Sequence, residues 1–358
     1  MPSHVKLFIP GPTEVRADVL AEMARPLISH RGAEMAALHR GVTEQAAAIM
    51  FTSHPVLLST SSATGLMEGG IRNAVERRVL SLVCGAFSER WHRIALDCGK
   101  EADAVSVPWG QAIRPEEVDA RLASGKYDAL TVAHNETSTG VANPLAGIAQ
   151  VMKKYPDVAF MVDTVSSLGG MPLKVDEMGI DLCLASVQKA LALPPGFSIA
   201  SVSPKIIDRS RRAKGKGFYF DFARMVDKAA QGQSFITPSV SHMFAMRKQF
   251  EHILAEGMER RWARHAQMAR LTRAWAKERF ALFADEAHAS DTLTCISNTR
   301  GAGISELIAA LRSEGMLIGN GYGDLKEKAF RIAHLGELTP TDVGELLAAI
   351  DRHLGVSR

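Results

Sequence analysis

Short apolar runs alternate with stretches of helical periodicity from Ala36 to Val202. Runs of strand length that are bounded by polar and turn residues predict β-strands, here Pro55–Ser59, Val79–Cys84, Ala104–Val107, Ala129–Ala133, Val158–Val162, Asp181–Ala185 and Ser198–Val202. Apolar positions spaced three and four residues apart predict helices between them, among others Leu66–Glu76, Ser88–Leu96, Pro115–Leu122 and Gly147–Lys153. Strands that alternate with helices indicate an α/β fold, with a mostly parallel sheet covered by helices on both faces.

The remainder of the chain has a different pattern. A long helical stretch from His242 to about Phe280 is broken near Gly257. After it, the pattern predicts the strands Leu293–Ile296, Met316–Ile318 and Ala329–Ile332 and the helices Ser305–Ser313 and Thr341–His353. We therefore expect an N-terminal arm (1–15), a large domain (16–250) and a smaller α+β domain (251–358). The arm is expected to be extended, because Pro10 and Pro12 bias the residues before them toward extended geometry.

Polar residues follow several of the predicted strands at the point where each strand ends. In parallel sheets, ligands bind outside the carboxyl ends of the strands, so these residues are candidates for a site. The segment Thr60–Gly65 leads into a helix, and such a start can bind an anion through free amide groups; an ordinary helix cap is the alternative. Phe87 and Trp91 follow another strand and could stack on a flat ring or pack in the core. The polar cluster His134–Gly140 follows a third.

Two charged residues give this edge of the sheet a specific chemistry. Lys189 lies in the segment DLCLASVQKALALPPG (181–196), among apolar residues, where an ammonium group is unusual without a partner. Asp163 ends the apolar run of the segment AFMVDTVSSLGG (159–170). A pyridoxal 5'-phosphate (PLP) enzyme needs such a pair: a lysine that binds the cofactor covalently and an acid that pairs with its ring nitrogen. Taken alone, Lys189 is better interpreted as a surface lysine at the end of a strand; the acid in the upstream segment is what favours the PLP interpretation.

The composition is that of an ordinary globular protein, with 358 residues, 46% hydrophobic residues and 23% charged residues. A formal net charge of +3 gives no reason to expect nucleic-acid binding, and the basic run Arg209–Lys216 is predicted to be a solvated face. The four cysteines are scattered, and Cys84, Cys183 and Cys295 lie in apolar runs, so we expect buried free thiols in a reducing compartment. No run is long enough to span a membrane and no signal peptide is evident, so a cytoplasmic protein is expected. For His30-Arg31 a solvated loop is the simplest interpretation.

Nine segments in chain order carry a family resemblance: FIPGPTEV, SHRG, SSATGLME, HNETSTGV, VDTVSSLGG, SVQKALALPPG, GFYFDF, ITPSVS and FRIAHLGEL. Together they resemble the class V aminotransferases of the fold-type I PLP enzymes. Within that class they are most similar to the alanine–glyoxylate and serine–pyruvate (serine–glyoxylate) aminotransferases. The resemblance extends from the arm to Arg331 and implies a large domain with a seven-stranded sheet, a smaller C-terminal domain, and a homodimer with shared active sites.

The resemblance also implies roles for individual residues. Lys189 would bind PLP covalently, Asp163 would pair with its ring nitrogen, and Arg331 would bind the substrate carboxylate in a pocket that includes Gly11. The other cofactor contacts would come from the phosphate-binding residues Ser62, Ala63, Thr64 and Gln188, from Thr237 of the partner subunit, and from Phe87, Ser138 and Val165 around the ring.

The expected reaction moves the amino group of a small amino acid, serine or alanine, to a 2-oxo acid, glyoxylate or pyruvate. Three alternatives stay open. An aminotransferase for a phosphonate or phosphorylated amino donor would share the same cofactor site. A PLP lyase of the cysteine desulfurase type needs a nucleophilic cysteine on a mobile loop, whereas Cys295 lies in a strand-like run. A non-catalytic subunit of a larger complex would not need Lys189, Asp163 and Arg331 together.

Overall fold

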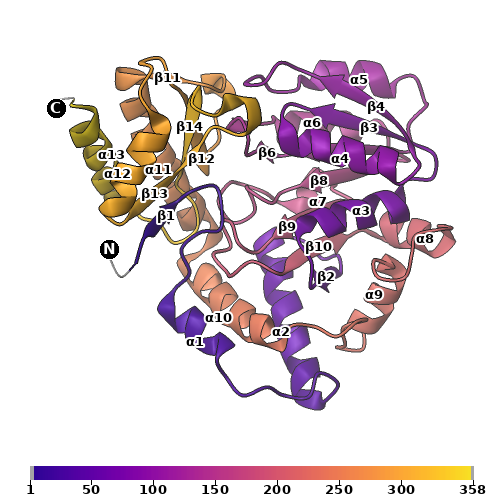
Figure 1. Cartoon of the computed structure of the whole chain (residues 1–358). Coiled ribbons are helices and arrows are strands. Elements are labelled where there is room, and N and C mark those ends of the chain that lie inside the picture. The colour runs from indigo at the N-terminus through magenta and orange to yellow at the C-terminus, as the bar shows by residue number, and fades with distance from the viewer. Residues whose placement is uncertain (1–3, 356–358) are drawn as a thin grey trace.

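A computed structural model describes residues 4–355 of the chain (Figure 1). The strands are β1 (Lys6–Phe8), β2 (Val56–Ser59), β3 (Arg78–Val83), β4 (Glu101–Ser106), β5 (Ala129–Ala133), β6 (Asn135–Glu136), β7 (Val141–Ala142), β8 (Ala159–Asp163), β9 (Leu182–Ser186), β10 (Ser198–Val202), β11 (Ala281–Leu282), β12 (Leu293–Ser297), β13 (Met316–Asn320) and β14 (Ala329–Ala333). The α-helices are α1 (Ala17–Met23), α2 (Ala33–Met50), α3 (Ala63–Ala74), α4 (Ala86–Asp97), α5 (Pro115–Leu122), α6 (Leu145–Met152), α7 (Val175–Met178), α8 (Pro204–Arg212), α9 (Phe222–Ala229), α10 (Val240–Glu256), α11 (Met258–Arg279), α12 (Ile304–Ser313) and α13 (Pro340–Leu354).

The larger sheet has seven strands in the order β2-β10-β9-β8-β5-β3-β4. β10 is antiparallel to both of its neighbours, and the other neighbouring pairs are parallel. The prediction of a mostly parallel α/β sheet is confirmed. Because β5, β8 and β9 run in the same direction, their carboxyl ends meet at one edge, with Ala133 directly opposite Asp163.

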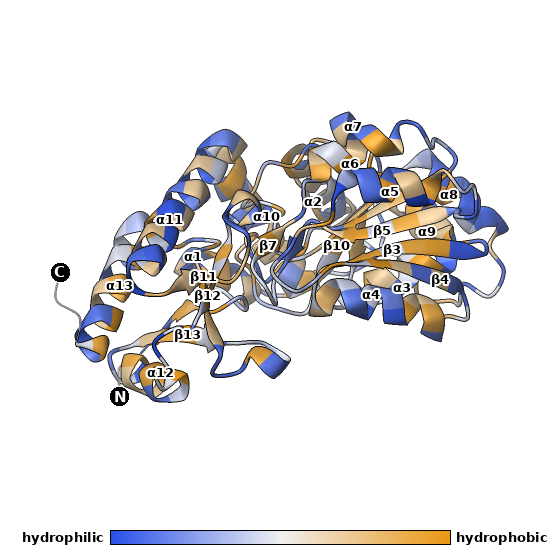
Figure 2. Cartoon of the chain, turned by 90° about the horizontal axis from the view of Figure 1, so that it is seen from above, coloured by the Kyte–Doolittle hydropathy of each residue, from blue (hydrophilic) through white to orange (hydrophobic). Residues whose placement is uncertain are grey.

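Helices cover both faces of this sheet because its strands are apolar on both sides. Successive side chains of a strand point to opposite faces. Thus Phe160 and Val162 pack in the core cluster that includes α2, α5, α6 and α10, whereas Met161 packs in the cluster that includes α3, α4, α8 and α9. Figure 2 shows α2, α5, α6 and α7 above the strands and α3 and α4 below them.

Among the boundaries that differ from the predicted ones, two have a clear physical reason. α3 begins at Ala63, three residues before the predicted Leu66, because its first turn contains small residues that carry no apolar periodicity. β4 begins at Glu101 although the predicted strand began at Ala104. β4 is the edge strand, and its first residues are polar because Arg78 of β3 pairs with Asp103 at 2.9 Å and also with Glu101.

A second sheet has the order β1-β13-β14-β12-β11 and packs against α11, α12 and α13 around the core cluster that contains Phe8 and Phe330. Residues 6–8 of the predicted arm form a strand that pairs in parallel with β13. The predicted break in the long helical stretch lies between α10 and α11 at Gly257, whose φ of +82° favours glycine. The domain limits given above remain a prediction.

Cys84, Cys183 and Cys295 are buried free thiols, as predicted. Within residues 4–355, no helix is both long and apolar enough to cross a membrane, and no cluster of three or more potential ligand side chains could hold a metal ion.

Candidate active site

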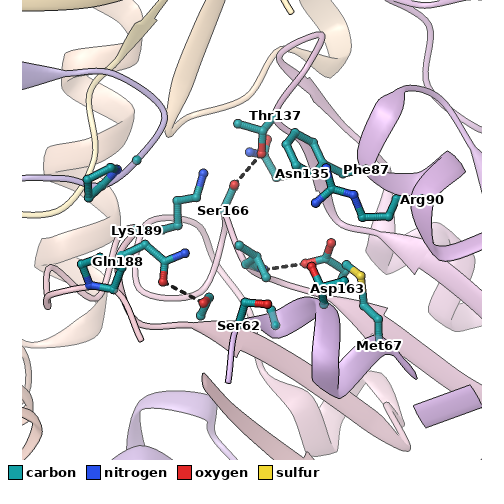
Figure 3. Close-up of a pocket in the computed structure, with 17 residues that line it drawn as sticks. Ser62, Met67, Phe87, Arg90, Asn135, Thr137, Asp163, Ser166, Gln188 and Lys189 are labelled. Atoms are coloured by element: carbon teal, nitrogen blue, oxygen red, sulfur yellow. Dashed lines mark hydrogen bonds between the residues drawn. The ribbon is translucent and has the colours of Figure 1, made fainter. Parts of the chain in front are cut away.

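A cavity of about 290 Å³ lies at the carboxyl ends of β8 and β9, between the arm and the first turns of α3 and α4 (Figure 3). Nine of the residues predicted for the site line it: Gly11, Ser62, Ala63, Thr64, Phe87, Asp163, Val165, Gln188 and Lys189. Its other lining residues are Pro12, Met67, Arg90, Asn135, Thr137, Ser166, Ser186 and Pro195. Ser138, Thr237 and Arg331 were also predicted for the site, but they do not line the cavity.

Lys189 reaches the cavity from the turn that joins β9 to β10. Its side chain is half-buried, and its Nζ donates a hydrogen bond to the carbonyl of Pro10. Burial and the positive charge of Arg331 lower the pKa of Lys189 to about 8, although the charge of Asp163 opposes the shift. The neutral, nucleophilic fraction of this amine near physiological pH is therefore far larger than that of an ordinary lysine.

The arm can approach Lys189 this closely because residue 11 is glycine. A Cβ atom at Gly11 would lie 2.8 Å from Cδ of Lys189, and the φ of +125° at this position is one that other residues rarely adopt. The predicted role of Gly11 in the pocket therefore has a steric reason in addition to its place in the lining.

Asp163 is the last residue of β8 and is only 5% exposed. Its Oδ1 accepts a hydrogen bond of 2.8 Å from the amide of Val165, and within residues 4–355 its other oxygen has no donor. Burial raises the pKa of Asp163 to about 7; the amide of Val165 and the charges of Lys189 and Arg90 oppose this rise, whereas Glu136 adds to it. A cationic N–H group bound in the cavity would stabilise the charged form of this carboxylate.

The first turn of α3 presents hydrogen-bond donors to the cavity. Ser62 is the N-cap residue, but its hydroxyl makes no capping bond to the helix, so it is available to a ligand. The amides of Ala63 and Thr64 belong to the first turn, whose N–H groups have no partner within a helix. The side-chain oxygen of Gln188 accepts from Ser186 at 2.7 Å, which leaves its amide nitrogen for the cavity. This arrangement of donors suits a phosphate group.

Phe87 forms a wall of the cavity at the start of α4, with its ring 5.4 Å from that of Tyr322 between centroids. The guanidinium of Arg90 lies 4.8 Å from the ring centre of Phe87 and also lines the cavity. Arg90 forms no ion pair with any residue in the range 4–355; its one side-chain hydrogen bond there is a long one, 3.4 Å, to the hydroxyl of Tyr322. Sequence reasoning missed Arg90, which could have been noticed as the residue one helical turn after Phe87.

Arg331 lies on β14, just outside the cavity. Its Nε donates to the carbonyl of Asn320 at 3.0 Å and its Nη1 to that of Thr137 at 3.3 Å. Burial lowers the pKa of Arg331, yet no carboxylate in the described part of the chain pairs with it. A half-buried guanidinium bonded only to carbonyl groups can still bind an anion such as a substrate carboxylate.

The structure places the other two predicted residues away from the cavity. Ser138 is completely buried, and its hydroxyl donates to Glu136 at 2.6 Å instead of facing the cavity. Thr237 is exposed in the loop before α10. From the polar cluster 134–140, it is Asn135 and Thr137 that line the cavity.

The residues present fit PLP. Donors suited to a phosphate lie at the start of α3, an aromatic ring lies on the wall, and a buried carboxylate with a free oxygen lies near a lysine whose pKa is lowered. The side-chain oxygen of Asn135 is buried and has no hydrogen-bond donor in the described part of the chain, which is a further sign that a polar group belongs in the cavity.

Comparison with known proteins agrees with this geometry. Residues 7–322 match the family model described as Aminotransferase class-V. An uncharacterized aminotransferase from Methanocaldococcus jannaschii is 37% identical over 354 residues, which cover 96% of this chain and 91% of that protein. An L-aspartate–glyoxylate aminotransferase from Paracoccus denitrificans is 32% identical over 352 residues, 95% of this chain and 88% of that protein. The solved structure of an alanine–glyoxylate aminotransferase from Nostoc sp. superposes with a TM-score of 0.93 at 27% identity, covering 99% of this chain and 96% of that one. The chain therefore belongs to the class V aminotransferase family.

Proposed function

We propose that this aminotransferase binds PLP through Lys189 and transfers the amino group of a small amino acid, serine or alanine, to glyoxylate or pyruvate. The observation that carries the proposal is the pair formed by Lys189 and Asp163 on one cavity, with the pKa of the amine lowered to about 8 and the carboxylate buried with a free oxygen. The names of the Paracoccus and Nostoc proteins support glyoxylate as the acceptor, because both names contain it, whereas the amino donors in the two names differ.

PLP, when bound, supplies an electron-accepting ring that stabilises negative charge at the α-carbon of the substrate. Asp163 would hold a proton on the ring nitrogen of bound PLP, which would keep the ring electron-poor. Lys189 in its neutral form removes the proton from the α-carbon of the amino acid, because a general base must be unprotonated to act. Arg331 binds the α-carboxylate through its planar, bidentate guanidinium.

Ser62, Ala63, Thr64 and Gln188 would hold the phosphate of PLP, and Phe87 and Val165 would pack against its ring. We assign Thr237 to the cofactor site of a partner subunit in a homodimer, and two observations support this assignment. Thr237 is exposed and does not line the cavity of its own chain. Phe218 is 66% exposed and packs against Phe235 near the same loop, which gives that surface an apolar area.

The test combines absorbance, trapping and turnover. The protein is incubated with PLP, the visible spectrum is recorded, and borohydride reduction followed by peptide mapping locates any covalently bound cofactor. We expect the label on Lys189, turnover of serine or alanine with glyoxylate or pyruvate, and neither colour nor turnover in Lys189→Ala. A colourless wild-type protein, or a label on another lysine, would refute the proposal. A coloured protein that is inactive with every donor would instead favour the non-catalytic subunit.

A second candidate is an acidic amino donor, such as aspartate or a phosphorylated amino acid. The specific observation in its favour is Arg90, a cation on the cavity wall with no carboxylate partner in residues 4–355. The donor panel should therefore contain aspartate and phosphoserine beside serine and alanine. Cysteine desulfurization is disfavoured because Cys295 is 2% exposed within β12, where burial raises the pKa of its thiol to about 12.

A further inference from the structure

Glu136 is completely buried and does not line the cavity; the only effect described for it so far is on the pKa of Asp163. Its carboxylate receives the amide N–H groups of Phe87 (3.2 Å to each oxygen) and Ser88 (2.9 Å), which belong to the first turn of α4. The hydroxyl of Ser88 lies 2.9 Å from Oε2. From its own loop, Glu136 accepts bonds from the amide (3.1 Å) and the hydroxyl (2.6 Å) of Ser138.

This carboxylate takes the place of the N-cap side chain that α4 lacks. The N-cap residue of α4 is Gly85, which has no side chain, so the first N–H groups of the helix need an acceptor from elsewhere. A negative charge at a helix N-terminus is also favourable, because the helix dipole is positive there. Glu136 forms no ion pair with any side chain in residues 4–355, so the helix end and the hydroxyl groups are what compensate its buried charge.

The glycine at position 85 leaves the space that this contact requires. A Cβ atom there would lie 2.5 Å from Cγ of Glu136, 2.6 Å from its Cδ and 2.6 Å from Oγ of Ser138. The φ of 167° at Gly85 is ordinary extended backbone, so the absence of a side chain at this position is explained by the approach of Glu136 and not by backbone strain. The start of α4 and the loop that carries Glu136, about fifty residues apart in the sequence, therefore pack closely at Gly85.

The turn that Glu136 holds carries cavity residues. Phe87 gives its amide to Glu136 while its ring forms the cavity wall, and Arg90, one turn further on, packs over that ring at 4.8 Å. We infer that Glu136 is a positioning residue: it caps α4 from the neighbouring loop and so fixes the ring of Phe87 at the orientation in which it stacks on the cofactor. The second half of this inference rests on the function proposed above; the first half does not.

The first test uses the apoprotein and measures amide hydrogen exchange at Phe87 and Ser88. Glu136→Gln places an NH₂ group among donors, and Gly85→Ala pushes the carboxylate away without changing its charge. The control is Glu89→Gln, because Glu89 is an exposed acid in the same helical turn. We expect exchange at these two amides to accelerate about tenfold or more in both variants and to stay at the wild-type rate in the control.

The second test measures the dissociation constant of PLP and the Michaelis constants of both substrates. We expect PLP binding to weaken about tenfold or more in Glu136→Gln and Gly85→Ala, with the KM for the amino donor within about twofold of wild type, because Arg331 is untouched. If Glu136→Gln does not fold, Gly85→Ala provides the same two measurements.

Two results would overturn the inference. Unchanged exchange at Phe87 and Ser88 in a folded variant would show that Glu136 does not cap α4. Faster exchange and a lower melting temperature with an unchanged affinity for PLP would show a structural role only. If instead wild-type protein fails to bind PLP, the proposed function is wrong, but the exchange data still decide whether the cap exists.

Discussion

The amine of Lys189 offers the sharpest test, because its proposed role depends on a measurable property of the apoprotein. Its pKa is lowered from 10.5 to about 8, by burial and by the charge of Arg331. At pH 7, the neutral fraction of such an amine is about 9%, compared with about 0.03% at the ordinary pKa, a difference of about 300-fold. The reactivity of Lys189 should therefore change strongly with pH, and this change can be measured.

The assay is trace acylation with a small neutral reagent at a series of pH values, read by mass spectrometry of the peptide that contains Lys189. The exposed Lys126, in the same digest, is the internal reference. The labelling rate of Lys189 should rise about tenfold per pH unit below pH 8 and then level off. In Arg331→Gln the plateau should move to higher pH, because one of the charges that lowers the pKa is lost. A rate for Lys189 that keeps rising to pH 10 would contradict the reasoning.

The same shift predicts how stability depends on pH. The folded pKa is below the unfolded value, so the unfolded chain binds more protons between about pH 8 and 10.5 and folding stability rises with pH across that window. Below pH 8 the charged amine lowers the free energy of unfolding by the full amount, which is about 3 kcal/mol for a shift of this size. Lys189→Met should therefore stabilise the apoprotein at pH 7 by up to about 3 kcal/mol in denaturant unfolding. A destabilised variant would show that the amine is favourably solvated.

Three further substitutions test the other parts of the site. Asp163→Asn should lower kcat by orders of magnitude, because a neutral amide does not hold the ring proton; a near-normal kcat would argue against that pairing. Arg331→Lys should raise the KM for amino donors while leaving the affinity for PLP unchanged, because lysine cannot form the bidentate contact; equal substrate kinetics would exclude the role. Gly11→Ala should slow PLP loading about tenfold or more, because its Cβ would lie 2.8 Å from Cδ of Lys189, whereas Gly99→Ala, with a positive φ but nothing within 4 Å, should not.

The alternation of strands and helices, and the two charged residues that line the cavity, could be predicted from local pattern. Each of the buried strands β8 and β9 is an uninterrupted apolar run, and Asp163 and Lys189 stand at or just after its end. The rule that ligands gather at the carboxyl ends of parallel strands then places both residues on one edge without any tertiary information. The start of the edge strand β4 is harder to predict, because an edge strand carries polar side chains and the first residues of β4 form no apolar run.

The orientation of single side chains within a polar segment is set by contacts that no local pattern records. The cluster 134–140 was recognised, but not which of its residues line the cavity: Asn135 and Thr137 do, while Ser138 turns toward Glu136. The orientation of Ser138 depends on Glu136, whose position is set by the space at Gly85 and by the first amides of α4, about fifty residues earlier in the chain. The sequence nevertheless contains two clues, because Glu136 has only Ser138 as a partner in its own loop and Gly85 has no side chain to cap the helix that follows it. A buried carboxylate requires donors and an uncapped helix requires an acceptor, so each of these residues supplies what the other lacks.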